Sequence, residues 1–166
     1  TFVIGGVDPT NPTYLGYIYD VIASTYVQRM DGSKADVFIF FQMAYNSAWS
    51  ALRDSDVELL RKVGIKFDYI PKHEDESFNH IMLEKFRILT LTQYERVLFM
   101  DGDVMARRNL DYLCELSLAG VLKKNVVIAG RQEPANGGFF ILTPRKGAFE
   151  RIQEMNTSIR SSTTTS

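Results

Sequence analysis

Hydrophobic and polar positions along the chain form two kinds of segment. Six short apolar runs are rich in β-branched and aromatic residues and are bounded by Gly, Pro, Asp or Asn, which is typical of β-strands. They cover residues 1–7, 35–41, 65–70, 96–101, 125–130 and 137–143. Longer segments with helical spacing predict helices at residues 14–30, 50–63, 77–92 and 144–156. Asp75 or Ser77 is placed to cap the third helix, and Pro144 suits the first turn of the last.

This alternation of strands and helices predicts an α/β fold. Near-continuous apolar strands are typical of a mostly parallel central sheet flanked by helices. Such sheets bind ligands at the carboxyl ends of their strands, so the residues that follow each strand are the first candidates for a site. The 166 residues are enough for one domain with a substantial core. The low-complexity end, SSTTTS, predicts a disordered tail over residues 157–166.

The fourth apolar run leads directly into two carboxylates, because YERVLFM is followed by Asp101-Gly102-Asp103. Two ionised carboxylates this close repel each other unless a positive charge compensates them. Mn²⁺ or Mg²⁺ binds hard oxygen ligands and completes its coordination shell with substrate phosphates. Gly102 leaves room beside such a cation for a ligand. The sequence therefore indicates a metal–diphosphate site, and an acidic turn after a strand is the alternative that so short a motif leaves open.

A second polar feature is a lysine on an otherwise apolar helical stripe. Steps of three or four residues place Lys85 on one face of the predicted helix together with Phe78, Ile81, Met82, Leu89 and Thr92. A lysine in that position either extends its ammonium to solvent or pairs with an anion. A diphosphate bound at Asp101 and Asp103 would supply that anion.

Asn136-Gly137-Gly138 forms a third polar feature, at the start of the sixth apolar run. Glycines in a strand permit close approach of a ligand to the backbone. The Asn136 amide can donate and accept hydrogen bonds to a hydroxyl-rich partner. A simple hairpin turn is the alternative interpretation of these three residues.

Composition excludes some classes of function. A formal net charge of −1 argues against a nucleic-acid-binding module, which usually has a basic face. No apolar run approaches the roughly 18 residues that cross a membrane, so we expect no membrane contact from this segment. The first residues do not resemble a signal peptide, and the missing initiator Met leaves upstream residues open. Cys114 is the single cysteine, so no internal disulfide can form, and we expect a buried thiol.

The stretch LEKFRILTLTQYERVLFMDGDVMARRNLDYL resembles the nucleotide-sugar-binding core of the family 8 glycosyltransferases, which include glycogenin and plant xylan glucuronosyltransferases. In that family a lysine lies sixteen residues before the first Asp of an Asp-x-Asp motif, as Lys85 lies before Asp101 here (101 − 85 = 16). Tyr14 and Ser24 fit the pattern of the family's first helix, and NGGFFIL resembles its Asn-Ser-Gly strand. The similarity spans roughly residues 1–156, and its central part is the most specific.

The resemblance implies a GT-A fold, with Mn²⁺ bound by Asp101 and Asp103 and bridging the diphosphate of a UDP-sugar. Lys85 would contact the phosphates and the sugar of this donor. Gly5, Gly6, Val7 and Tyr14 would hold the uridine, with Tyr14 stacking on the base. Asn136 and Gly138 would line the sugar pocket, and Gly102 and Gly137 complete the implied substrate-binding residues.

The implied reaction moves the sugar, with retention of its anomeric configuration, to a hydroxyl of a glycan, protein or other acceptor. The metal would neutralise charge on the departing UDP. The sequence identifies no covalent nucleophile.

The chain departs from the family pattern in three respects. A histidine normally supplies a third metal ligand far downstream of the Asn-Gly strand, whereas His73 and His80 both precede Asp101. An Asp-Gln pair normally follows that Asn by some 25 residues, about where this sequence ends at Ser166. Gly137 stands where the family has Ser or Ala. We therefore expect the donor-binding portion of a transferase, without its acceptor side.

Two other functions agree with parts of the sequence. A phosphatase of the haloacid dehalogenase type also ends a strand in Asp-x-Asp, but it requires Thr or Val two positions later, where this chain has Met105. A non-catalytic module that binds a nucleotide or a glycan would keep the same residues without turnover. The sequence leaves open the sugar, the acceptor, the oligomeric state, and whether the protein works in the cytosol or the Golgi lumen.

Overall fold

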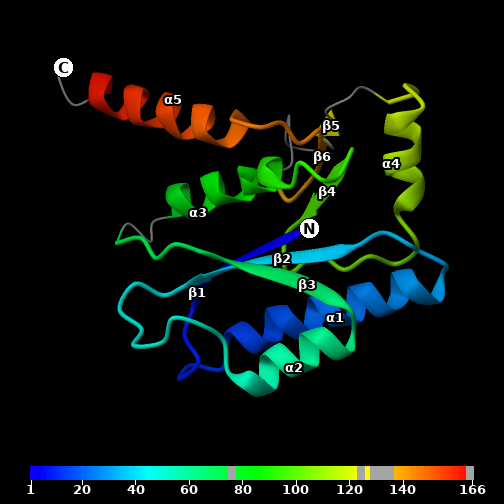
Figure 1. Cartoon of the computed structure of the whole chain (residues 1–166), viewed down its shortest axis with the longest axis horizontal. Helices are drawn as coiled ribbons and strands as arrows, with labels where there is room; N and C mark the ends of the chain where they lie inside the picture. The colour runs from blue at the N-terminus through cyan, green and yellow to red at the C-terminus, as the bar shows by residue number, and fades with distance from the viewer. Residues whose placement is uncertain (75–77, 123–125, 128–136, 164–166) are drawn as a thin grey trace.

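A computed structural model describes residues 1–74, 78–122, 126–127 and 137–163 (Figure 1). Within these residues the strands are β1 (Phe2–Val7), β2 (Val37–Met43), β3 (Ile65–Ile70), β4 (Val97–Met100), β5 (Val126–Val127) and β6 (Phe139–Leu142). The helices are α1 (Tyr14–Met30), α2 (Asp54–Lys62), α3 (Phe78–Glu84), the 3₁₀ helix η1 (Lys85–Thr90), α4 (Asp111–Leu118) and α5 (Ala148–Thr163). In the described part of the chain, no helix has the length and apolar character needed to cross a membrane.

Strands β1, β2 and β3 form a parallel sheet in that order. Strand β6 pairs antiparallel with both β4 and β5. The two sheets meet at β1 and β4, because the backbone nitrogen of Thr1 donates to the Leu98 carbonyl (2.7 Å) and the Met100 amide donates to the Thr1 carbonyl (2.9 Å). This is the hydrogen-bond pattern of a parallel pair, so β1 and β4 end at the same edge. The predicted α/β fold is confirmed, with β6 as the strand that reverses direction.

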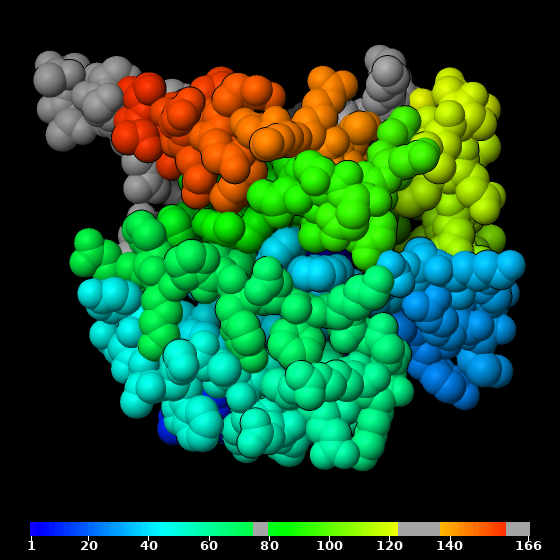
Figure 2. Space-filling model, viewed as in Figure 1, coloured from blue at the N-terminus to red at the C-terminus, as the bar shows by residue number. Residues whose placement is uncertain are grey.

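Helices cover both faces of the sheet. Figure 1 shows α1 and α2 on one face of β1, β2 and β3, and α3 and α5 on the other. The space-filling view shows α5 lying over α3 and η1 on that second face (Figure 2). Side chains of β2 serve both layers, because successive residues of a strand point to opposite faces. Ile39 and Phe41 belong to the core under α1 and α2, whereas Phe40 belongs to the core under η1.

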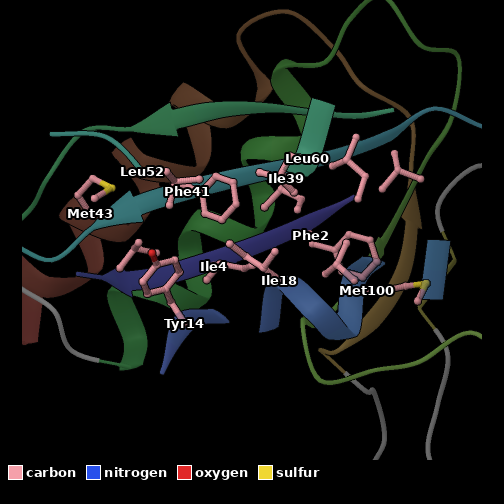
Figure 3. Packing of buried hydrophobic residues seen from close by; sticks show 14 of the residues in the cluster. Phe2, Ile4, Tyr14, Ile18, Ile39, Phe41, Met43, Leu52, Leu60 and Met100 are labelled. Atoms are coloured by element: carbon pink, nitrogen blue, oxygen red, sulfur yellow. The ribbon is translucent and has the colours of Figure 1, made fainter. Parts of the chain in front are cut away.

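The main core lies between the parallel sheet and α1. It buries Phe2 and Ile4 of β1 against Ile18 of α1, and Met100 of β4 joins the same cluster (Figure 3). At roughly 25 cal/mol per Å² of apolar surface, burial of each such side chain contributes about 1.5–3 kcal/mol. This core therefore fixes the position of α1 relative to the ends of β1 and β4.

Several element boundaries differ from the prediction. The predicted helix 144–156 begins only at Ala148, so Pro144 lies before its first turn. The same helix continues to Thr163, so residues 157–163 are helical where the sequence predicted a disordered tail. Asp75 and Ser77, the predicted caps, lie outside the described residues.

Two further differences concern helices. The predicted helix 50–63 begins at Asp54, where Asp54 and Asp56 in its first turn complement the helix dipole. Helix α4 was not predicted, and it carries Cys114, whose thiol is half-buried and has its pKa raised by burial.

Tyr14 anchors the start of α1 in the core, as Figure 3 shows. Its ring is only 4% exposed, and its hydroxyl donates to the Asp56 carboxylate at 2.5 Å. The Arg53 guanidinium donates to the same carboxylate oxygen at 3.1 Å. Burial, followed by the hydrogen bond to Asp56, raises the pKa of Tyr14 to about 12. This contact joins α1 to α2.

We predict that Tyr14→Phe lowers the free energy of unfolding by about 1–2 kcal/mol at neutral pH, because it removes a hydrogen bond to a buried carboxylate. The folded pKa of Tyr14 lies above its ordinary value of 10.0, so the wild-type advantage is complete below pH 10 and is lost as the pH rises through about 12. Urea unfolding of both proteins across this window measures the difference. Tyr19→Phe, at an exposed tyrosine of α1, is the control. A wild-type advantage that stays constant from pH 9 to 12 would contradict the assignment.

Candidate functional site

The site is centred on residues 101–103, which we call the Asp-Gly-Asp turn. It follows β4 directly, and strand alternation continues into it: Phe99 lies in the core under η1, whereas Met100 lies in the core against α1. The Asp101 amide donates to the Gly138 carbonyl (2.9 Å), which ties the turn to the start of β6. The Asp101 side chain is 31% exposed, and Asp103 is exposed. Both carboxylates are therefore accessible at the carboxyl end of β4, as predicted.

Helix α1 holds the turn from one side. A Cβ atom on Gly102 would lie 3.3 Å from Cδ1 of Tyr17, so the ring of Tyr17 occupies the space that a larger side chain would need. Three residues beyond the turn, the Ala106 amide donates to the buried hydroxyl of Ser24 at 3.0 Å. The turn and the segment that follows it are thus packed against α1, and Ser24 has a clear structural role.

Lys85 approaches the turn from the opposite layer. It lies where α3 changes into η1, and Ile88 and Leu89, three and four residues later, are buried, which confirms that Lys85 is on the inward face. Its side chain is 12% exposed, and its ammonium lies 2.6 Å from Oδ1 of Asp101. The lysine is therefore paired within the chain and does not extend to solvent, and its partner is Asp101. The predicted contact of Lys85 with a diphosphate stays a prediction.

Two more contacts of the Lys85 ammonium define its position. It donates to the Gly137 carbonyl at 3.4 Å, a long hydrogen bond. It also lies 5.5 Å from the centre of the Phe99 ring, within the range of a cation–π contact. Lys85 thus connects the helix layer, the end of β4 and the start of β6.

Other predicted site residues also lie along α3. A Cβ atom on Gly5 would be 3.4 Å from Cδ1 of Ile81, and one on Gly137 would be 3.2 Å from Cε of Met82. One helix therefore packs against both glycine segments. Gly6 is exposed and has a φ of 64°, which favours glycine. The predicted donor residue Asn136 lies outside the described residues.

Tyr14 is placed differently from the prediction. A ring that is 4% exposed and packed in the core presents no face on which a uracil could stack. Val7 is fully buried as well, so its side chain belongs to the core. The aromatic ring at the turn is Tyr17, one helical turn later, which is 45% exposed. The family pattern of the first helix pointed to Tyr14. Which of the two tyrosines is buried depends on how α1 is rotated about its axis on the sheet.

Asp101 and Asp103 are the residues of the turn that could hold a divalent cation, which would then share its coordination with a substrate. Two carboxylates supply hard oxygen ligands, and Mg²⁺ or Mn²⁺ of this kind completes its shell with phosphates and water. Within the described ranges, no group of three or more His, Cys, Asp or Glu side chains could hold a metal alone. The two histidines do not join the turn in a ligand set, and their rings stack on each other at 3.9 Å between centroids.

Comparisons with known proteins add to this picture. No protein-family model matches the chain. It is 23% identical over 148 residues to UDP-glucuronate:xylan alpha-glucuronosyltransferase 1 of Arabidopsis thaliana, covering 87% of this chain and 21% of that protein. It is 31% identical over 89 residues to UDP-glucuronate:xylan alpha-glucuronosyltransferase 2 of the same plant, covering 54% of this chain and 14% of that protein.

Among solved structures, the chain is similar to the glycosyltransferase GlyE of Streptococcus pneumoniae TIGR4. The TM-score is 0.58 at 17% sequence identity, over 96% of this chain and 38% of that chain. These similarities confirm the predicted resemblance to glycosyltransferases and the GT-A-type fold. The chain spans about a fifth or less of the length of these curated relatives.

We predict that Gly102→Ala destabilises the fold by about 1 kcal/mol, because the added methyl group forces the Tyr17 ring to move. The cost should largely disappear in a Tyr17→Ala background, where the ring is absent. A double-mutant cycle in urea unfolding measures this coupling. Gly16→Ala is the control, because its Cβ would meet nothing within 4 Å and alanine favours the helix. Strictly additive effects of Gly102→Ala and Tyr17→Ala would show that the two residues are not in contact.

Proposed function

We propose that this chain is the donor-binding part of a metal-dependent glycosyltransferase that moves a sugar from a UDP-sugar to a hydroxyl acceptor with retention of configuration. The observation that carries the proposal is the meeting of Lys85 and Asp101 beside the Gly137 carbonyl, at the edge where parallel sheets bind ligands. The similarity to two proteins whose names describe transfer from UDP-glucuronate to xylan supports it. The acceptor is a glycan, a protein or another hydroxyl compound.

Each part of the site has a distinct role in this proposal. Asp101 and Asp103 hold Mn²⁺ or Mg²⁺, and the bound cation supplies Lewis-acid stabilisation of the departing UDP. Lys85 binds the diphosphate and orients the sugar. Asn136, with the backbone of Gly137 and Gly138, lines the sugar pocket. The Lys85 side chain is 12% exposed and that of Asp101 is 31% exposed, so their interactions with charged groups are stronger than those of fully exposed side chains.

The uridine is expected to lie along the exposed end of β1, at Gly5 and Gly6. We assign the aromatic contact with the nucleotide to Tyr17 in place of Tyr14. The Tyr17 ring is exposed and adjoins Gly102, the residue between Asp101 and Asp103, whereas the Tyr14 ring is buried. Base–aromatic contacts of this kind contribute about 1–3 kcal/mol.

Thermal unfolding tests the metal–nucleotide site. Mn²⁺ plus UDP at about 100 times its Kd should raise the Tm by roughly 5–10 °C, because the pair binds the folded state. The double variant Asp101→Asn with Asp103→Asn should lose this rise and keep its fold. Asp54→Asn with Glu58→Gln, which neutralises two exposed acids on α2, is the matched control and should keep the rise. An unchanged rise in the Asp101/Asp103 variant would remove these residues from the site.

Turnover separates an enzyme from a binding module. Incubation with Mn²⁺ and a panel of UDP-sugars, followed by an assay for released UDP, should show release with one preferred donor. Saturable binding of UDP and Mn²⁺ without any release would favour a non-catalytic module that uses the same residues.

For Tyr17 we predict that Tyr17→Ala weakens UDP binding in saturating Mn²⁺ by about tenfold, because it removes the aromatic contact. Isothermal titration calorimetry measures the change. Tyr19→Ala removes another exposed ring of α1, one that lines the groove between α1 and α2, and should leave UDP affinity unchanged. Equal UDP affinities for wild type and Tyr17→Ala would exclude Tyr17 from the nucleotide contact.

A further inference from the structure

Lys85 contacts the same carboxylate that the proposed function assigns to the metal. The ammonium lies 2.6 Å from Oδ1 of Asp101, and both side chains are partly shielded, at 12% and 31% exposure. The acid next to Lys85 in the sequence, Glu84, pairs with Arg87 at 2.6 Å. Among the described residues, the ion pair of Asp101 is the one with Lys85. Any cation that binds Asp101 must therefore compete with the Lys85 ammonium for this carboxylate.

We infer that Lys85 competes with the divalent cation for Asp101, and that a diphosphate relieves this competition by taking the lysine ammonium. The inference rests on the proposed function and adds to it a reason why the metal and the diphosphate bind together. Lys85 makes the metal and the diphosphate bind as a coupled pair, so that neither occupies the site well alone.

The physical basis is the repulsion between two positive charges at one carboxylate. An ammonium 2.6 Å from Oδ1 neutralises Asp101 and occupies one of its oxygens, which lowers the affinity of that carboxylate for another cation. A diphosphate offers Lys85 several oxygen acceptors with more negative charge than a single carboxylate. Contacts with the Gly137 carbonyl and the Phe99 ring hold the ammonium at the centre of the site. From there it can exchange Asp101 for the diphosphate.

Thermodynamic linkage turns this exchange into a measurable quantity. The factor by which UDP tightens Mn²⁺ binding equals the factor by which Mn²⁺ tightens UDP binding. Part of that factor comes from direct contact between the cation and the phosphates, and part from the release of Asp101 by Lys85. Removal of the ammonium eliminates only the second part.

The experiment measures Mn²⁺ binding to the whole chain by calorimetry or by the spin resonance of free Mn²⁺, first alone and then with UDP. In Lys85→Met, Mn²⁺ alone should bind about fivefold more tightly, because the competing ammonium is gone. UDP in saturating Mn²⁺ should bind at least about tenfold more weakly, because a charged hydrogen bond is lost. With UDP bound, Lys85 no longer occupies Asp101, so the substitution should leave the Mn²⁺ affinity of the UDP-bound chain nearly unchanged. The coupling factor should therefore fall about fivefold. A single substitution is thus expected to shift the two affinities in opposite directions.

Two variants control for charge and for position. Lys85→Arg keeps the positive charge and should keep the weak binding of Mn²⁺ alone. Lys62→Met removes an ammonium that pairs with Glu58 on α2, at 2.9 Å, and should change neither affinity. Circular dichroism and the Tm verify that each variant is folded. If Lys85→Met does not fold, Lys85→Gln replaces it in the same measurements.

The outcomes distinguish this inference from the proposed function. If Lys85→Met leaves Mn²⁺ affinity unchanged or weaker, the competition is disproved, and the proposed function still stands when Asp101→Asn with Asp103→Asn abolishes UDP–Mn²⁺ binding. If the wild-type chain binds no Mn²⁺ with UDP, both the function and the inference are overturned.

Discussion

A positive charge must compensate the two carboxylates that end β4, and the rest of the site depends on how the fold supplies it. Lys85 provides a positive charge for the first of them through its 2.6 Å contact with Asp101. The packing of α3 places Lys85 there, with Ile81 against Gly5 of β1 and Met82 against Gly137, just before β6. An ion pair between partly shielded groups is stronger than a surface pair and depends on accurate placement. Electrostatics and helix packing are therefore inseparable here.

The Asp-Gly-Asp turn is supported from both layers of the domain. On one side, Tyr17 packs against Gly102, and the Ser24 hydroxyl accepts a hydrogen bond from the backbone beyond the turn. On the other side, Lys85 reaches Asp101 and the start of β6. Side chains whose positions are set by packing give a site its geometry before a ligand arrives. Such preorganisation suits recognition of a charged ligand, because binding then requires the exchange of Lys85 from Asp101 to the phosphates and little other movement.

Similarity to known glycosyltransferases and the local chemistry contribute different things. At 17% identity, the likeness to GlyE concerns the fold. A fold supports many functions, so the functional argument must come from particular side chains. Here the spacing of Lys85 and Asp101 in the sequence corresponds to a direct contact in space, which gives the motif a physical meaning. The proposed metal–diphosphate site rests on the carboxylates, the lysine and the glycine backbone that meet at this turn.

The sequence by itself determined much of this description, because local patterns carry it. Apolar runs located the strands, α1 was predicted with its observed bounds, and helical spacing placed Lys85 on an inward face. The adjacency of β4 and the acids predicted where the turn would lie. Periodicity reports which residues are buried, but it does not report what they meet.

Only the tertiary structure decided the partners. It paired Lys85 with Asp101, and it buried Tyr14 while leaving Tyr17 exposed at the turn. Two tyrosines three residues apart lie on neighbouring parts of one helix, and the packing of α1 on the sheet determines which of them faces the core. The reversal of β6 likewise depends on pairing between strands far apart in the chain. Contacts between distant segments arise from how whole elements pack, and a local pattern of residues contains no information about that packing.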